Sequence, residues 1–278
     1  MSYHKNGDKF KCHYCNYEIK FNHVCPKCDN KDFLFMGSGT QKIEEVIEKF
    51  YPEAKLLRMD NDTTNIKNGH FKILEKFKNE DYNILLGTQM VAKGLDFHDV
   101  TLVGVINADI SLSAADFRSA EFTFELLSQV AGRAGRGQKT GNVIIQTYNP
   151  EHYAIMMASK HEYELFYQTD MMFRHRLKYP PFSYMSSITI YGEKSDQICI
   201  IADKMADKLS EYKEFETLGP SFPFLYKENE KYKIRIIIKS KNNQLIKEVL
   251  NKLNNEFSKE IKERKCSVLY DIDTYHLL

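Results

Sequence analysis

The 278-residue sequence lacks the features of a membrane or exported protein. Its longest apolar runs, such as VTLVGVI and IRIII, are much shorter than the roughly 20 residues that span a bilayer. No apolar segment follows the basic residues of the start, MSYHKNGDKFK, as a signal peptide would require. We therefore expect a cytoplasmic protein that makes no contact with a membrane, and its hydrophobic content of 42% is enough for packed cores.

Neither sign of charge dominates the chain. There are 39 Lys and Arg residues against 38 Asp and Glu residues, so the net charge is +1. This balance provides no overall attraction to nucleic acid, and any such binding must come from local patches. One candidate is the stretch from Lys227 to Lys241, although a solvated surface is the plainer interpretation of a charge run alone.

A loop that holds nucleotide phosphates is also missing. The nearest match, GRAGRGQKT at residues 132–140, has Gln138 where G-x4-G-K-[ST] requires lysine. The segment also follows a predicted helix and precedes a predicted strand, which is the reverse of the order that such a loop needs. No acidic metal-binding motif follows a strand either. We expect that this chain by itself does not hold Mg-ATP.

Cysteine is sparse but clustered. Four of the six cysteines have the spacing Cys12-x2-Cys15-x9-Cys25-x2-Cys28, in which each C-x2-C turn aims two thiolates at one point. In a cytosolic protein this pattern predicts Zn²⁺ binding, the alternatives being a reduced cysteine cluster or the broken relic of a metal site. A closed site of four thiolates is structural, because no coordination position is left for water or substrate.

Hydrophobic patterns divide the remainder into an α/β region and a small α+β region. We predict a zinc-binding module at 1–33, an α/β lobe at 34–150, a helical connector at 151–181 and a C-terminal α+β domain at 182–278. In the lobe, the apolar runs NILLGT, TLVGVINAD and NVIIQTY alternate with helical patterns, which favours a parallel sheet covered on both faces. Ligands of such sheets collect at the carboxyl ends of the strands.

The C-terminal region reads as strand–helix–strand–strand–helix–strand, and its clearest strand is YKIRIIIK. Alternation places Tyr232, Ile234, Ile236 and Ile238 on one face of that strand and Lys233, Arg235 and Lys239 on the other. Helices packed on the apolar face would leave the cations in water. We therefore predict that these three cations contact DNA phosphates.

Four segments carry a resemblance to a known family. RMDNDTT (58–64), GTQMVAKGLDF (87–97), DFRSAE (116–121) and QVAGRAGR (129–136) together resemble the second motor lobe of superfamily-two helicases. The zinc knuckles ahead of GSGTQ, and the YPPF break before the last domain, are most similar to the PriA (primosomal protein N′) family of replication-restart helicases. The resemblance implies a RecA-like lobe that closes on a first lobe, which carries the phosphate loop.

The resemblance also implies roles for residues of the ATP site. QVAGRAGR is similar to helicase motif VI, which makes Arg136 the arginine finger toward the γ-phosphate, Arg133 its partner or sensor, and Gln129 a positioning residue. The planar fork of arginine suits this work, because it binds two phosphate oxygens and stabilises charge in phosphoryl transfer. VAKGLDF is similar to motif V, in which Gly94 admits the backbone and Asp96 faces the ribose or the finger.

Other positions match DNA-contacting residues of the family. Thr88, Gln89 and Lys93 fall at positions that touch the DNA backbone, although Lys93 could instead bridge to the nucleotide. Asp109 is a weaker candidate, for coupling the DNA site to the ATP site. The implied partners are forked and single-stranded DNA, single-strand-binding protein and other primosome proteins.

The chain departs from the family pattern in its cysteines. The family has four C-x2-C pairs interleaved around two zinc ions, and only two pairs occur here. Either the four thiolates close around one ion or each pair is half-coordinated. The expectation is a fragment or natural truncation of an ATP-dependent 3′–5′ DNA helicase that uses ATP with Mg²⁺ only when the first lobe is present. Another superfamily-two helicase lobe, or a non-catalytic zinc-containing DNA-binding protein, remains the alternative.

Overall fold

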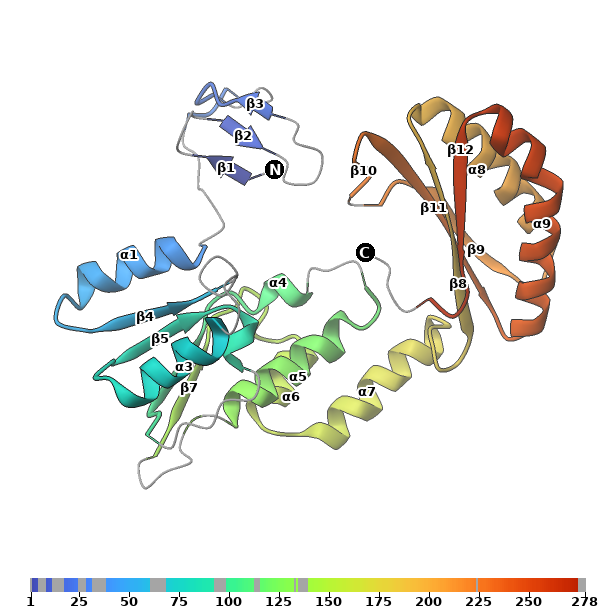
Figure 1. Cartoon of the computed structure of the whole chain (residues 1–278). Helices are drawn as coiled ribbons and strands as arrows, with labels where there is room; N and C mark the ends of the chain where they lie inside the picture. The colour runs from blue at the N-terminus through green and yellow to red at the C-terminus, as the bar shows by residue number, and fades with distance from the viewer. Residues whose placement is uncertain are drawn as a thin grey trace. The chain divides into compact units, whose positions relative to one another are not determined.

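A computed structural model describes residues 2–4, 9–11, 18–24, 29–31, 39–60, 69–92, 99–112, 116–132, 134, 140–223 and 225–274 (Figure 1). The chain divides into two compact units. The first unit comprises Met1–Lys31, Ala114–Phe117 and Gln168–Leu278, and the second comprises Asp32–Ser113 and Arg118–Tyr167. Among the described residues, no helix combines the length and apolar character that crossing a membrane requires.

The second unit is built on parallel strand pairs, as the apolar runs predict. β4 (Leu56–Met59) pairs with β5 (Ile84–Gly87), and β6 (Leu102–Val105) pairs with β7 (Asn142–Ile145). Within the described residues these are two separate pairs rather than one continuous sheet. Each parallel pair needs a crossover, which helices supply. The helical elements of this part are α1 (Thr40–Phe50), α3 (Gly69–Asn79), η1 (Gln89–Ala92), α4 (Asp109–Leu112), α5 (Ser119–Ala131) and α6 (Tyr153–Ser159).

The core of the second unit forms where α5 packs on α6. Phe124 and Leu127 of α5 meet Ala154 and Ile155 of α6, and all four are buried. Phe124 also stacks on Phe166 of α7 (Tyr163–Arg176), with ring centroids 4.1 Å apart. Aromatic pairs at this separation add to the gain from burial alone. These contacts hold α5 firmly along the face opposite its exposed residues.

The C-terminal region has the predicted order of elements, with one short strand in addition. Its antiparallel sheet has the order β10-β11-β8-β12, and β9 pairs with β11. The elements are β8 (Tyr184–Gly192), α8 (Ser195–Ser210), β9 (Glu216–Ser221), β10 (Lys227–Glu228), β11 (Lys231–Ser240), α9 (Asn243–Glu263) and β12 (Cys266–Asp271). The addition is β10, which pairs with the start of β11.

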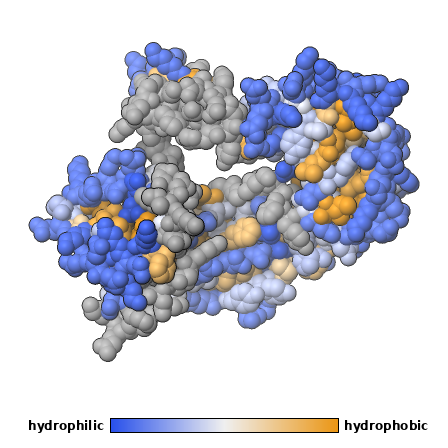
Figure 2. All heavy atoms as spheres, viewed as in Figure 1, coloured by the Kyte–Doolittle hydropathy of each residue, from blue (hydrophilic) through white to orange (hydrophobic). Residues whose placement is uncertain are grey.

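Both helices of this region cover the same face of the sheet (Figure 1). Ile234, Ile236 and Ile238 are buried against them, which confirms the predicted apolar face of β11. Val249 and Leu253, which lie four residues apart in α9, complete the same cluster. On the surface of this region, apolar side chains form a stripe framed by hydrophilic ones (Figure 2).

The N-terminal segment forms an antiparallel sheet of β1 (Ser2–His4), β2 (Lys9–Lys11) and β3 (Glu18–Lys20). Cys12, Cys15, Cys25 and Cys28, the predicted zinc ligands, lie outside the described residues. In the part of the chain that the structure describes, no group of three or more His, Cys, Asp or Glu residues is arranged to hold a metal ion.

Candidate nucleotide and nucleic-acid site

Gly87 brings two strands of the second unit unusually close together. A Cβ atom at this position would lie 2.5 Å from the carbonyl oxygen of Met59 and 2.2 Å from Cγ2 of Val91. Only glycine therefore lets β5 end against β4 and turn directly into η1. Thr88 and Gln89, two of the predicted DNA contacts, follow this glycine and are both exposed.

The turn after β5 lies next to the helix that leads to the GRAGR segment. η1, which begins with Gln89, packs against α5. Gln129 occupies the last turn of α5 and is exposed. The structure thus brings the element of a predicted DNA contact against the helix of a predicted nucleotide residue. Arg133, Arg136, Gly94, Asp96 and Lys93 lie outside the described residues.

Asp109 ties the carboxyl ends of β6 and β7 together. Its buried carboxylate accepts hydrogen bonds from Thr147 Oγ1 at 3.0 Å, the Tyr148 amide at 2.8 Å and Asn149 Nδ2 at 2.8 Å. Burial by itself raises the pKa of Asp109, but these donors outweigh it and lower the pKa below its ordinary value. The carboxylate is therefore an ionised anchor for the start of α4.

A second contact from α4 extends this anchor toward the exposed turn. Gln89 Nε2 donates to Ser111 Oγ at 3.5 Å, so α4 touches the turn after β5 as well as the loop after β7. Hydrogen bonds of this length are weak. The role of Asp109 in coupling two sites remains a prediction, and the geometry shows a link from α4 to one of them.

At the C-terminal sheet, two of the three predicted DNA cations have partially accessible side chains. Lys233 forms an ion pair with Glu228, and its ammonium lies 5.8 Å from the ring centroid of Tyr191. Arg235 Nε donates to Thr189 Oγ1 at 3.4 Å. Both cations are half-buried on the face of β11 opposite the helices.

Lys239 does not face solvent, and that part of the sequence-based expectation is wrong. Lys239 is 4% exposed, and its ammonium lies 2.7 Å from a carboxylate oxygen of Glu216. It also donates to the carbonyl oxygen of Leu177 at 3.0 Å. The physical reason is strand register, because β9 places Glu216 directly opposite Lys239. An isolated strand pattern cannot reveal which neighbour neutralises a cation.

Exposed aromatic side chains lie near the cations, and the sequence reasoning did not single them out. Phe222 is 48% exposed and Tyr226 is 52% exposed, with ring centroids 6.3 Å apart. The Tyr226 ring lies 6.3 Å from that of Tyr232, over which the Lys227 ammonium sits at 4.8 Å. Interleaved aromatic and basic residues suit single-stranded nucleic acid, whose bases stack on exposed rings. The sequence PSFPFLYKENEKYK, residues 220–233, contains this alternation of aromatic and basic residues.

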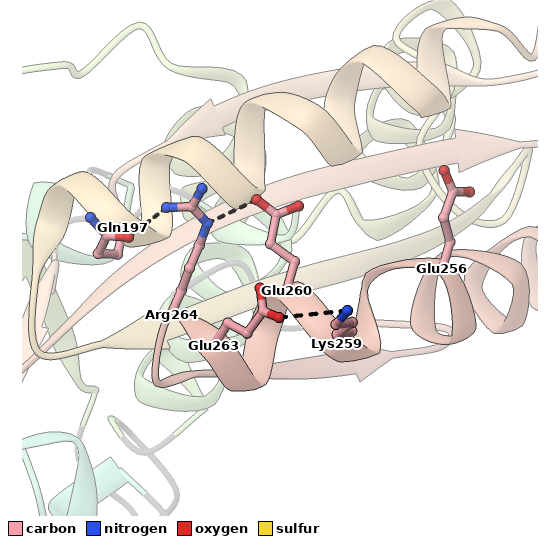
Figure 3. A pocket seen from close by; sticks show the side chains of 6 residues that line it. All are labelled: Gln197, Glu256, Lys259, Glu260, Glu263 and Arg264. Atoms are coloured by element: carbon pink, nitrogen blue, oxygen red, sulfur yellow. Dashed lines mark hydrogen bonds and ion pairs between the residues drawn. The ribbon is translucent and has the colours of Figure 1, made fainter.

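A polar groove of ≈ 560 Å³ on the helical side of this region is unsuited to phosphate (Figure 3). Arg264 points between Gln197 and Glu260, at 2.5 and 2.8 Å. Glu260 also binds Lys204 at 2.8 Å, and hydrogen bonds from Lys204 and then Arg264 lower the pKa of this carboxyl. Because three glutamates line the groove with two cations, we interpret it as a link between α8 and α9.

Family models match both halves of the chain. The helicase conserved C-terminal domain matches residues 20–138, and the primosomal protein N C-terminal domain matches residues 175–275. The replication restart protein PriA of Bacillus subtilis (strain 168) is 42% identical over 100% of this chain. The protein of the same name from Borreliella burgdorferi is 38% identical over 99% of it. The chain belongs to the PriA family. It spans 35% and 41% of the lengths of these two curated relatives.

Membership of the PriA family agrees with the sequence-based resemblance and gives the second unit its fold class. The helicase match covers α1 to α5, so this unit is a RecA-like α/β lobe. The PriA-specific match covers all strands and helices from β8 to β12. The described carboxyl ends of β5, β6 and β7 are therefore the edge at which a ligand of such a lobe is expected.

Proposed function

We propose that this chain supplies the second motor lobe and the C-terminal domain of an ATP-dependent 3′–5′ DNA helicase of replication restart. The observation that carries the proposal is the packing of η1 against α5. It joins the predicted DNA-contact turn at Thr88 and Gln89 to the helix that precedes Arg133 and Arg136. A motor needs such a connection, because nucleotide binding at one site must change the contacts with DNA at the other.

In this proposal the chain completes an ATP site whose phosphate loop belongs to another lobe. When both lobes are present, hydrolysis of bound Mg-ATP would supply the free energy that drives the motor. Arg136 would stabilise the charge that develops on the γ-phosphoryl group, with Arg133 beside it and Gln129 positioning both. Gly94 and Asp96 would approach the nucleotide or the finger, and Lys93 would contact DNA or bridge to the nucleotide. The chain alone would then not hydrolyse ATP.

DNA binding would combine phosphate contacts with base stacking. Thr88 and Gln89 are exposed at the motor turn, and Lys233 and Arg235 lie on the C-terminal sheet. Nearby, the exposed rings described above offer stacking surfaces for unpaired bases. Forked and single-stranded DNA are the proposed substrates, and single-strand-binding protein and other primosome proteins are the proposed partners. Lys239 has no part in this contact, since it is buried, with 4% of the residue exposed.

Zinc would hold the N-terminal module together. β2 ends at Lys11 and β3 begins at Glu18, and the two strands pair antiparallel. In chain order, Cys12 and Cys15 come between β2 and β3, and Cys25 and Cys28 come after β3. Thiolate pairs of this spacing fit one tetrahedral structural zinc ion.

The DNA part of the proposal is tested by the salt dependence of binding. Fluorescence anisotropy with a labelled single-stranded oligonucleotide would be measured on the chain and on Lys233→Glu and Arg235→Glu. Each lost phosphate contact is expected to flatten the slope of log K against log salt by about 0.7. Lys259→Glu is the matched control, since its side chain is 89% exposed in the polar groove on the helical side. Equal slopes in all four proteins would refute DNA binding by this sheet face.

A further inference from the structure

A hollow lies directly after β7, the last strand of the RecA-like lobe. Its volume is ≈ 360 Å³, and five consecutive residues line it: Tyr148, Asn149, Pro150, Glu151 and His152. Pockets that bind small ligands begin at about 300 Å³, so there is room here for one small, flat ring system. The hollow follows the carboxyl end of β7, at the edge of the lobe where a ligand is expected. We call it the β7 hollow.

Hydrogen bonds hold the backbone of the β7 hollow in one arrangement. The buried carboxylate of Asp109 accepts from the Tyr148 amide and from Nδ2 of Asn149, both at 2.8 Å. The amide of His152 closes the turn by donating to the carbonyl oxygen of Asn149 at 3.0 Å. A ligand that enters therefore does not have to order the loop, and pre-organised sites avoid that entropic cost.

The side chains of the β7 hollow suit a nucleobase better than a phosphate group. Tyr148 is 72% exposed, so its ring offers a surface on which a base can stack. Pro150 adds a second apolar surface. The five lining residues include no lysine or arginine, whereas Glu151 adds a negative charge. A carboxylate repels phosphate but accepts hydrogen bonds from the amino group of a base.

His152 and Asn149 provide a hydrogen-bond donor and an acceptor. Nδ1 of His152 accepts from the Ala154 amide at 3.2 Å. Burial lowers the pKa of His152, although the nearby Asp109 carboxylate opposes the shift. The ring is therefore neutral at pH 7 and carries its hydrogen on Nε2, which can donate to a ring nitrogen or carbonyl oxygen of a base. Asn149 gives its Nδ2 to Asp109, which leaves its Oδ1 as an acceptor.

The β7 hollow is close to the predicted DNA-contact turn of the same unit. Gln89, in that turn, donates to Ser111 of α4 at 3.5 Å, and Asp109 at the start of α4 binds the Tyr148 amide. Ser111 and Asp109 are two residues apart, which is about 3 Å along a helix. All of these residues belong to the second unit. A strand whose backbone contacts Gln89 is thus near enough to place a base in the hollow.

We propose that the β7 hollow receives one unpaired base of the DNA strand whose backbone contacts Thr88 and Gln89. The base stacks on Tyr148, and its edge meets His152 and Asn149. Because the hollow binds a base and no phosphate, it adds affinity for single-stranded DNA without releasing counterions. The inference rests on the proposed function for the presence of DNA, and it adds the place at which a base is held.

The affinities of two oligonucleotides test whether a base occupies the hollow. Fluorescence anisotropy would measure binding of a labelled thymidine strand and of an abasic strand of the same length. Tyr148→Leu should bind the thymidine strand about fivefold more weakly or worse, as expected for the loss of one base stack, and should bind the abasic strand unchanged. Its slope of log K against log salt should stay the same, since no phosphate contact is lost. Tyr148→Phe keeps the ring and should bind both strands as the original chain does.

Tyr51→Leu is the matched control for the loss of an exposed ring. Tyr51 is 65% exposed in the same unit and precedes β4, so it lies toward the amino ends of the strands. The inference is overturned if Tyr148→Leu binds the thymidine strand as tightly as Tyr51→Leu does, or if it loses affinity for both strands equally. Binding of adenosine monophosphate that Tyr148→Leu abolishes would assign the hollow to a free nucleotide and would also overturn it.

Failure of this inference can be distinguished from failure of the proposed function. If the unaltered chain binds neither strand, the DNA part of the proposed function fails, and the base site fails with it. If the chain binds DNA but Tyr148→Leu behaves like the control, only the base site is refuted. None of these outcomes depends on ATP hydrolysis.

Discussion

Substituting Gly87 by alanine should destabilise the second unit by a calculable amount. The new Cβ would meet the Met59 carbonyl oxygen at 2.5 Å and Val91 Cγ2 at 2.2 Å, and no real Cβ approaches backbone so closely. Overpacking of this kind costs about 1–3 kcal/mol. Alanine also restricts the unfolded chain, which offsets roughly 0.4–1 kcal/mol. We expect a net loss of about 1–2 kcal/mol in the free energy of unfolding.

The matched control for this prediction is Gly104→Ala in β6. Gly104 is also a strand glycine of the second unit, but nothing lies within 4 Å of its added Cβ. The chain has no tryptophan, so urea unfolding would be followed by circular dichroism. Gly87→Ala should lower the midpoint while Gly104→Ala leaves it unchanged or raises it. If the two variants agree within about 0.5 kcal/mol, the size of an ordinary surface effect, the close approach of β4 and β5 is refuted.

Three further predictions concern buried charge and metal. Because the folded-state pKa of Asp109 is lowered, the ionised carboxylate stabilises the fold fully above a pH of about 4, and this stabilisation is lost as the pH falls through the folded pKa. Asp109→Asn should therefore make the free energy of unfolding less dependent on pH in the acid range. An unchanged pH dependence would contradict the role of Asp109 as an ionised anchor. Lys239→Met should lower the free energy of unfolding by about 1–3 kcal/mol yet leave DNA affinity unchanged, whereas weaker DNA binding in the folded variant would return Lys239 to the DNA contact. The purified chain should contain zinc by atomic emission, with less in Cys12→Ser, and a metal-free but folded N-terminal module would argue against the four-thiolate site.

The fold of the C-terminal region was predictable because its signals are local. The alternation in YKIRIIIK corresponds to one buried face, and the structure confirms it. The four-residue spacing of Leu245, Val249, Leu253 and Phe257 in α9 likewise corresponds to one packed face. Parallel pairing in the second unit was likewise indicated by continuous apolar strands separated by helices. In each case the decisive information lies within about 20 residues of sequence.

The fate of individual polar residues was not predictable, because it depends on partners far away in sequence. Lys239 and Lys233 lie on the same face of β11 by alternation, but only Lys239 is paired with Glu216 of the neighbouring strand β9. Phe117 shows the same limit, since its ring stacks on that of Tyr179, 62 positions later in the sequence. Sequence motifs therefore indicated which residues are chemically suited to bind phosphate or DNA, and the tertiary structure decided which of them are accessible.

The most direct test of the account is ATP hydrolysis by a fusion in which this chain replaces the matched 35% of the Bacillus subtilis PriA. We predict DNA-stimulated hydrolysis by the fusion and none by the chain alone. Arg136→Ala in the fusion should lower kcat by roughly 10³-fold or more, as loss of an arginine finger does, with a much smaller change in the KM for ATP. Hydrolysis by the isolated chain, or a fusion whose kcat is indifferent to Arg136, would contradict the composite site.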